Sequence, residues 1–253
     1  MKRAGRATLT LLSLIAALFA LAAFNNARTP RPVPLHTFAA VRVESAAGSV
    51  GRALFSSSPV SDDPARAAIR RRLRHGEPGT YIAEILVQRD SALARWPDRD
   101  KDPLSIWIQP TSDVVDWTEH YVYRVREAFE EWGSLDIPVR FRFVRDSARA
   151  DVHVTWIDHF NEPISGRTKW ARDDDYYITD ADIVLAVHHH QGEILEEDAM
   201  RAMALHEIGH LLGLDHTQDS SSIMAPKVRV RDLSAADRAT VKLLYSLPPG
   251  AVR

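Results

Sequence analysis

The chain of 253 residues contains no cysteine. This absence excludes a disulfide framework, thiolate ligands for zinc and a cysteine nucleophile. Any metal site in the protein must therefore be built from histidine and carboxylate side chains.

The sequence also lacks a surplus of charge of either sign. Its 32 Lys and Arg residues are balanced by 34 Asp and Glu residues, so the formal net charge is −2. Binding to the phosphates of a nucleic acid requires a concentrated basic excess, and we therefore expect no nucleic acid partner. With 45% hydrophobic residues, the chain has the composition of a globular protein with one sizeable core and an N-terminal extension.

Residues 1–27 have the pattern of a signal peptide or N-terminal anchor. Lys2, Arg3 and Arg6 form a basic start, and residues 9–24 are almost wholly apolar. Small residues near the end of this run offer cleavage sites, whereas the length of the run also suits an uncleaved anchor. We expect an exported protein, secreted or periplasmic, that contacts a membrane only if this segment anchors it.

Residues 28–95 are predicted to be a pro-segment or linker with short helices. Prolines and serines interrupt residues 28–79 repeatedly, and an arginine-rich stretch at residues 64–75 predicts a helix with a solvated face. A second helical pattern covers residues 80–96, and its apolar spacing predicts that it docks on the domain that follows.

The main domain is predicted at residues 96–247, where strand and helix patterns alternate. Alternating apolar and polar residues predict strands, and the candidates are residues 104–109, 139–143, 152–156, 167–171 and 181–187. Asp116 and Glu119 are placed like a capping box that would begin a helix ending at Gly133. One face of this helix carries an apolar stripe that is predicted to enter the core, and its residues are Trp117, Tyr121, Val125, Phe129 and Trp132.

Candidate metal ligands lie in the segment HEIGHLLGLDH at residues 206–216. His206 and His210 are four residues apart in a predicted helix at residues 200–212, so both side chains project from one helix face and can reach one ion. Gly213 permits the backbone turn that ends the helix and delivers His216 as a third nitrogen ligand. Three protein ligands leave one coordination position open, which is typical of a catalytic zinc site.

Glu207 is the candidate general base because it follows the first ligand directly. Its carboxylate could take a proton from zinc-bound water as that water attacks a carbonyl group. In a purely structural zinc site, Glu207 would have no chemical use. Five fixed identities at fixed offsets arise by chance on the order of once in 100,000 chains of this length, so the extended pattern is far more specific than a bare H-E-x-x-H.

This segment resembles the zinc signature H-E-x-x-H-x-x-G-x-x-H of the metzincin peptidases, and residues 222–226, SIMAP, resemble their Met-turn. The flanks are most similar to the matrixin branch, and the similar segments are AFEEW at 128–132, FRF at 141–143, ADVHV at 150–154, and residues 233–245. The resemblance implies an α+β, zincin-like catalytic domain. In this fold a twisted mixed sheet and two helices lie above the cleft, and a small C-terminal part carries a third helix.

The same resemblance implies Zn²⁺ as the cofactor and hydrolysis of peptide bonds in a protein or peptide substrate, and we expect a monomer. It places Met224 beneath the ligands His206, His210 and His216 as a hydrophobic floor, and it places the substrate along the free edge of strand 167–171. Two alternatives stay open on the residues alone. One is a zinc-binding module of this fold without turnover, and the other is a hydrolase of a non-protein amide.

Familiar animal matrixins also hold a structural zinc and calcium ions, but no clear match to those ligand patterns exists here. Candidate residues are Asp158, His159, the acidic group 173–175 and the histidine triplet 188–190. Adjacent residues of one strand cannot all face one ion, so a second metal and a plain polar loop remain alternatives. The cysteine-based latency of the family is excluded because the chain has no cysteine.

Overall fold

The computed structural model describes residues 73, 76–89 and 92–251, and these belong to one compact unit. The predicted export signal lies outside the described residues, as does the predicted arginine-rich helix apart from Leu73. Within the described part, no helix is both long and apolar enough to cross a membrane.

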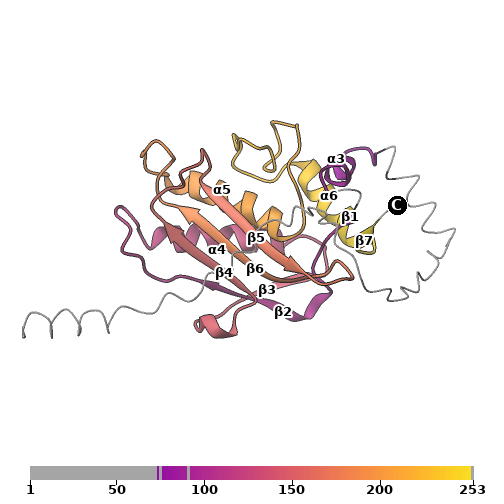
Figure 1. The fold of residues 1–253 in the computed structure, drawn as a ribbon, viewed down its shortest axis with the longest axis horizontal. Coiled ribbons are helices and arrows are strands. Elements are labelled where there is room, and N and C mark those ends of the chain that lie inside the picture. The colour runs from indigo at the N-terminus through magenta and orange to yellow at the C-terminus, as the bar shows by residue number, and fades with distance from the viewer. Residues whose placement is uncertain (1–72, 74–75, 90–91, 252–253) are drawn as a thin grey trace, which may run out of the picture. The chain divides into compact units, whose positions relative to one another are not determined.

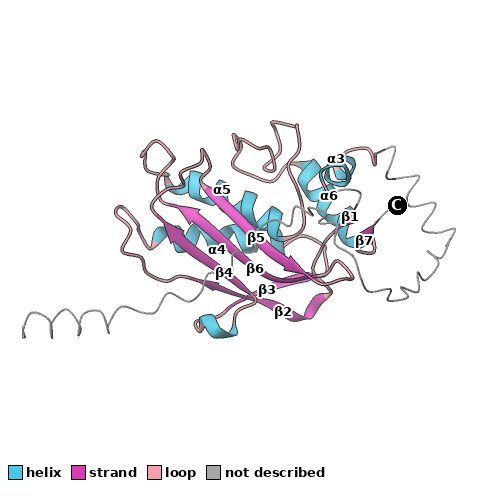
Figure 2. Ribbon diagram, in the orientation of Figure 1, coloured by secondary structure: helices cyan, strands magenta, loops and turns pink. Residues whose placement is uncertain are grey.

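A five-stranded mixed sheet forms the centre of the fold, with the strand order β3-β2-β4-β6-β5 (Figures 1 and 2). The strands are β2 (Arg99–Ile108), β3 (Val139–Phe143), β4 (Val152–Ile157), β5 (Gly166–Arg172) and β6 (Ile178–Ala186). All neighbours are parallel except β5, which runs antiparallel to β6. Strand β5 is the last in this order and so is an edge of the sheet, and no described strand pairs with the other side of its backbone.

Four α-helices accompany the sheet in the described part of the chain. They are α3 (Ile82–Gln88), α4 (His120–Gly133), α5 (Glu197–Leu211) and α6 (Ala235–Ser246), and a short 3-10 helix, η1 (Ser147–Arg149), precedes β4. Helices α4 and α5 lie together on one face of the sheet, while α3 and α6 lie beside each other near one end of it (Figure 1). The predicted fold class, an α+β domain with two helices on a mixed sheet and a third in the C-terminal part, is confirmed.

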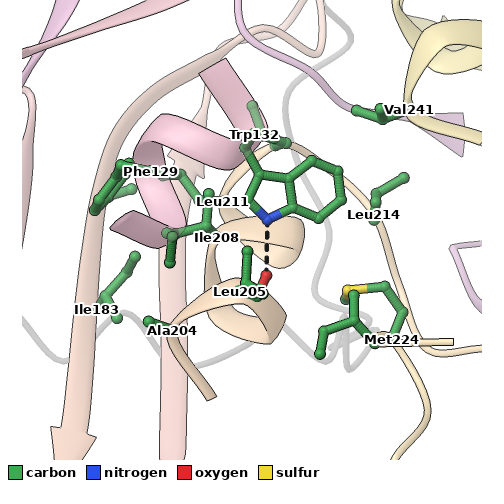
Figure 3. Close-up of a cluster of buried hydrophobic side chains, with 14 of the residues drawn as sticks. Phe129, Trp132, Ile183, Ala204, Leu205, Ile208, Leu211, Leu214, Met224 and Val241 are labelled. Carbon is green, nitrogen blue, oxygen red and sulfur yellow. Dashed lines mark hydrogen bonds between the residues drawn. The ribbon is translucent and has the colours of Figure 1, made fainter. Parts of the chain in front are cut away.

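The core lies between the sheet and the two long helices (Figure 3). The predicted apolar stripe is buried along α4 from Tyr121 onwards, and Phe129 and Trp132 have no exposed surface, whereas Trp117 precedes the helix and is half-buried. The indole nitrogen of Trp132 donates a hydrogen bond of 2.9 Å to the carbonyl oxygen of Leu205 and so joins α4 to α5. Burial of each large apolar side chain contributes roughly 1.5–3 kcal/mol, and α5 is thereby held firmly against the sheet.

The predicted start of α4 is wrong. The helix begins at His120 with Glu119 as its N-cap, and no side chain caps it. Asp116 lies in a left-handed backbone conformation with φ of 62°, outside the helix. Its carboxylate instead pairs with His188, a long-range contact that outweighs the local capping pattern.

The predicted helix at residues 80–96 is correct only in its first half. Helix α3 ends at Gln88, and the chain continues into the two-residue strand β1 (Ala92–Leu93), which pairs with β7 (Gly250–Ala251). Leu93 is buried as expected, but by the returning C-terminal chain rather than by a helix. Leu93 lies eight positions after Ile85, a spacing that is compatible with a continued helix and with a short strand, so the spacing alone could not distinguish the two. The predicted docking is confirmed, since Ile82 and Ile85 are fully buried.

Three further elements begin earlier than predicted. Strand β2 starts at Arg99 and passes through a register irregularity before Leu104, β6 starts at Ile178, and α5 starts at Glu197. The added residues are largely charged or polar and carry no apolar periodicity. Their structure comes from pairing and helix extension beside elements that are already fixed.

Candidate metal centre and catalytic residues

The structure brings all three predicted ligands together. His206 and His210 project from consecutive turns of α5, and the helix ends just after them. Gly213 then takes a φ of 97°, and a side chain at this position would meet the carbonyl oxygen of Ala94. Only glycine combines this conformation with such a close approach, and the turn that it makes returns the chain so that His216 faces the helix.

The Nε2 atoms of the three histidines form a nearly equilateral triangle. The distances are 3.2 Å between His206 and His210, 3.3 Å between His210 and His216, and 3.3 Å between His216 and His206. Three nitrogen ligands placed tetrahedrally at 2.0–2.1 Å from a zinc ion would be about 3.3 to 3.4 Å apart. Within the described residues, this is the one group of three or more potential ligands with metal-binding geometry.

Hydrogen bonds at the opposite nitrogen fix the orientation of two of the rings. The Nδ1 atom of His206 lies 2.7 Å from the carbonyl oxygen of Ile223, and that of His210 lies 3.1 Å from the carbonyl oxygen of Leu214. A carbonyl oxygen can only accept, so Nδ1 carries the proton in each ring and Nε2 presents its lone pair. This pattern is typical of imidazoles that bind a metal.

Burial keeps the histidines neutral, as metal binding requires. Burial lowers the pKa of His206 to about 4 and that of His210 to about 3, and it also lowers the pKa of His216. Three lone pairs within 3.3 Å of each other repel unless a proton or a cation lies between them, and these pKa values disfavour the proton. The donor set therefore fits a divalent ion such as Zn²⁺.

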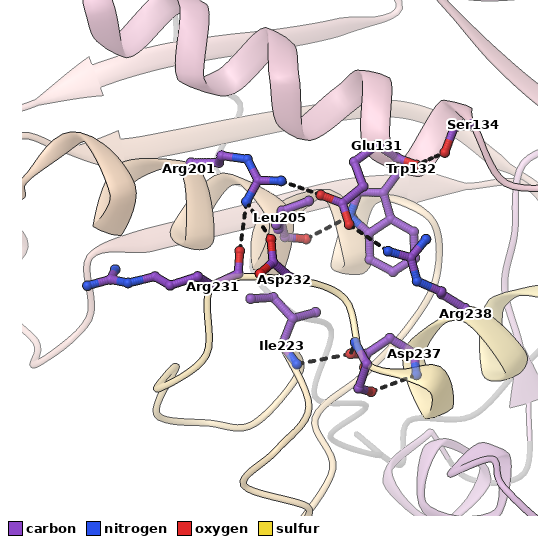
Figure 4. Close-up of polar contacts among 11 residues, drawn as sticks. Glu131, Trp132, Ser134, Arg201, Leu205, Ile223, Arg231, Asp232, Asp237 and Arg238 are labelled. Atoms are coloured by element: carbon purple, nitrogen blue, oxygen red, sulfur yellow. Dashed lines mark hydrogen bonds and ion pairs between the residues drawn. The ribbon is translucent and has the colours of Figure 1, made fainter.

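The turn after the ligands supports them from below. Met224 is fully buried and packs against Gly209, where an added side chain would meet its sulfur atom, so it lies under α5 as the family resemblance implies. The turn is held by Asp237 at the start of α6, whose carboxylate accepts from the amide nitrogen of Ile223 at 3.0 Å (Figure 4). Asp237 and Ser234 also form a capping box, so one buried carboxylate begins α6 and binds the amide of Ile223, the residue whose carbonyl oxygen contacts His206.

Glu207 lies beside the ligand triangle with only 3% of its surface exposed. Its carboxylate Oε2 accepts a hydrogen bond of 2.6 Å from the hydroxyl group of Thr168 on β5. Burial raises the pKa of Glu207 to about 7, and the bond from Thr168 and the positive charge of Arg167 oppose that rise. A carboxylate with a pKa near neutrality can both accept and release a proton at neutral pH, which is what general acid and base catalysis requires.

The edge strand approaches Glu207 closely because it begins with a glycine. A side chain at Gly166 would meet the carboxylate of Glu207. The amide nitrogen of Ala186 donates to the carbonyl oxygen of Ser165 at 2.9 Å, so this pair is hydrogen-bonded. Pairing alternates along antiparallel strands, and the backbone groups of Thr168 and Trp170 therefore face the free edge rather than β6.

Of the residues considered for a second metal, His159 and His188 both contact Asp158, but among the described residues they form no group with metal-binding geometry. In the described part, His188 bridges two carboxylates, with Nδ1 at 2.7 Å from Asp158 and Nε2 at 3.1 Å from Asp116, on opposite sides of its ring. His189 contacts Ser165, and His190 contacts the carbonyl oxygen of Phe160. Each histidine of the triplet thus has different partners, and the three side chains do not point toward one common ion position.

Sequence reasoning missed two residues of this site. Thr168 was expected only as part of the strand that pairs with the substrate, and Asp237 only as part of a helix pattern. The capping-box spacing of Ser234 and Asp237 was a usable signal for the start of α6, but no local pattern indicates that the same carboxylate supports the turn at Ile223. The contact from Thr168 to Glu207 joins positions 39 apart in the chain.

Comparisons with known proteins found a matching family and several relatives of this chain. A family profile described as Matrixin matches residues 95–246, more than half of the chain. The metalloendoproteinase 1-MMP of Arabidopsis thaliana is 30% identical over 181 residues, covering 60% of this chain and 46% of that protein. The metalloendoproteinase 5-MMP of the same plant is 25% identical over 176 residues, or 61% of this chain and 46% of the relative. The matches thus span slightly less than half the length of these relatives.

Proposed function

The chain belongs to the matrixin family of peptidases, and on this premise we propose that it is a zinc-dependent metalloendopeptidase. The observation that carries the proposal is the triangle of Nε2 atoms on His206, His210 and His216, with the buried carboxylate of Glu207 beside it. The metalloendoproteinase names of the two plant relatives support the same reaction class.

In this proposal, the three histidines hold Zn²⁺ through Nε2. The bound ion would supply Lewis-acid chemistry, which polarises a scissile carbonyl group and acidifies water. Ile223 and Leu214 hold the Nδ1 protons of His206 and His210, so these rings meet the ion in the correct tautomer without rearrangement.

Glu207 acts as the general base in this proposal. Its carboxylate takes a proton from the water that attacks the peptide carbonyl and passes it to the leaving amine. Burial supplies the raised pKa that makes the return of the proton possible, while Thr168 holds the carboxylate in place. A module that only bound substrate would not need a buried carboxylate at this position, and this favours catalysis over the binding module.

We propose that the substrate lies extended along the free edge of β5. The outward backbone groups of Thr168 and Trp170 would pair with the peptide as an added strand. Since Thr168 also contacts Glu207, this pairing would bring the peptide backbone next to the general base. The geometry suits an extended peptide better than a compact non-protein amide, because only a peptide can continue the strand pairing before and after the bond that is cleaved.

Removal and return of the metal tests the proposal. The purified full-length protein is treated with a chelator, dialysed, and assayed for cleavage of a peptide library before and after the addition of Zn²⁺. We expect cleavage to disappear with the metal and to return with zinc. Cleavage that survives in demonstrably metal-free protein would contradict the proposal.

We also propose that the protein is exported, because residues 1–27 combine a basic start with an apolar run. Fractionation of cells that express the full chain tests this. Intact protein with its N-terminus retained, found solely in the cytosol, would contradict it.

A further inference from the structure

A segment that precedes the matched family region contacts the loop with the third ligand. Residues 81–89, here called the strap, comprise Tyr81, helix α3 and Arg89, whereas the family match begins at residue 95. Residues 214–218, here called the ligand loop, contain His216 and no regular secondary structure. Side chains of the strap contact every residue of the ligand loop.

Arg89 makes the most extensive of these contacts. Its Nε atom lies 2.9 Å from the carboxylate of Asp215, and its Nη2 atom donates to the carbonyl oxygen of Leu214 at 3.0 Å. The guanidinium group also lies over the ring of Trp170 on β5, 5.0 Å from its centroid. One side chain therefore ties the strap to the ligand loop and to the edge strand.

Two residues of α3 reach the remainder of the ligand loop. The side-chain amide of Gln88 donates to the carbonyl oxygen of His216 at 2.7 Å. The two carboxylate oxygens of Glu84 accept from the hydroxyl group of Thr217 at 3.0 Å and from the amide nitrogen of Gln218 at 2.8 Å.

The strap is itself anchored in the core, so it can serve as a fixed support. Ile82 and Ile85 are fully buried. The hydroxyl group of Tyr81 donates to the buried carboxylate of Asp237 at 3.0 Å, and its amide nitrogen donates to the hydroxyl group of Thr240 at 3.1 Å.

His216 needs such a support more than the other two ligands do. Among the described residues, Nδ1 of His206 and of His210 meets a carbonyl oxygen, but no hydrogen bond forms at Nδ1 of His216. The orientation of this ring must therefore follow from its backbone. The amide nitrogen of His216 donates to Asp215 at 2.8 Å, and Asp215 is held by Arg89, while Gln88 holds the carbonyl oxygen.

We propose that the strap positions the third metal ligand and is a permanent part of the catalytic domain. Gln88 and Arg89 act as positioning residues, because they fix both backbone groups of His216 without reaching the metal. The proposal rests on the proposed zinc site. Proteolytic maturation that preserves activity must then cut the chain before Tyr81 and not at the start of the matched region.

The test compares Arg89→Ala with Arg140→Ala in the full-length protein. Arg140 is a matched control at the other edge of the sheet, where it also binds backbone carbonyl groups, of Ile137 and Val139, and pairs with Asp100. Two quantities are measured, namely the Kd for Zn²⁺ by competition with a chromophoric chelator and the amide hydrogen exchange of the ligand loop in metal-free protein.

We expect Arg89→Ala to raise the Kd for Zn²⁺ by about 10-fold or more, since loss of a residue that orients a ligand costs about 10- to 100-fold in metal affinity. Exchange at the amides of Leu214 and Thr217 should become faster. Arg89→Lys, which keeps the charge but not the planar fork, should give an intermediate Kd. Arg140→Ala should change neither quantity.

Gln88→Ala removes an exposed side chain and provides a second variant if Arg89→Ala does not fold. It should weaken zinc binding in the same direction. An unchanged Kd and unchanged exchange in a folded variant of either residue would overturn the positioning role while leaving the zinc site intact. If the wild-type protein bound no zinc, the proposed function would fail, and faster exchange in Arg89→Ala would still support the role of the strap.

Discussion

The hydroxyl group of Thr168 on the edge strand lies 2.6 Å from the carboxylate of Glu207 on α5. It joins the strand that would bind the substrate to the residue that would act as general base. The Thr168 hydroxyl also lies 2.9 Å from the carbonyl oxygen of Glu207, so it contacts both the backbone and the side chain of this residue.

Thr168→Val should slow peptide cleavage without loss of zinc. Valine keeps the shape of threonine but leaves the buried carboxylate of Glu207 without its donor. A hydrogen bond to a charged group contributes about 1.5 to 3 kcal/mol, so we expect kcat/KM to fall by about 10-fold or more. Thr155→Val on β4 is the matched control and should keep wild-type kinetics. Equal kcat/KM in the wild type, Thr168→Val and Thr155→Val would show that Thr168 has no role in catalysis.

Backbone methylation of the substrate should reveal the pairing with β5. Only alternate amides of an added strand face the sheet, and the outward groups on this side belong to Thr168 and Trp170. Peptides that carry one N-methyl group at successive positions should therefore show a raised KM at every second position. Uniform tolerance of methylation, or uniform sensitivity to it, would argue against the strand pairing.

The contacts of His188 with the carboxylates of Asp116 and Asp158 should make the free energy of unfolding depend on pH. Hydrogen bonding to Asp116, followed by that to Asp158, raises the pKa of His188 above its usual value of 6.5, against the effect of burial. A histidine whose pKa is higher in the folded than in the unfolded protein stabilises the fold. This stabilisation is fully present at pH values below the unfolded-state pKa, and it is lost as the pH rises through the folded-state pKa. The other oxygen of Asp158 lies 2.7 Å from Nδ1 of His159, so this carboxylate contacts both imidazole rings.

Denaturant unfolding of wild-type protein and His188→Gln at several pH values measures this effect. The difference in unfolding free energy should be largest below about pH 6.5 and should shrink as the pH rises. Asp116→Asn should weaken this pH dependence because it removes the first contribution to the shift. A difference that stays constant with pH would show that His188 does not titrate in the folded protein.

Much of the site could be predicted because it is local in sequence. The spacing of His206 and His210 requires only helical geometry, and Gly213 with His216 requires only one turn. Alternation likewise located strands 139–143 and 152–156, since Val152, Val154 and Trp156 all point into the core. In these cases the pattern and the three-dimensional contact involve the same few residues.

The remainder could not be predicted, because it depends on contacts between distant segments. Arg89 and Asp215 are 126 positions apart, and the arginine follows a short helix within the segment that was predicted to be a pro-segment or linker. Asp116 leaves the helical conformation because His188, 72 positions later, captures its carboxylate. Charge, polarity and spacing were visible in the sequence, but the identity of each partner was not.

In the proposed mechanism, Glu207 acts as the general base while His206, His210 and His216 hold the ion. The most direct test measures zinc content and peptide cleavage together for Glu207→Gln, with His206→Ala as the comparison. Glutamine keeps the size of the side chain but has no basic carboxylate, so we expect full zinc content with cleavage reduced about 100- to 10,000-fold. His206→Ala should lose zinc affinity as well. Wild-type-like cleavage by Glu207→Gln would contradict the assignment of the base, and loss of its zinc would show that Glu207 supports the metal instead.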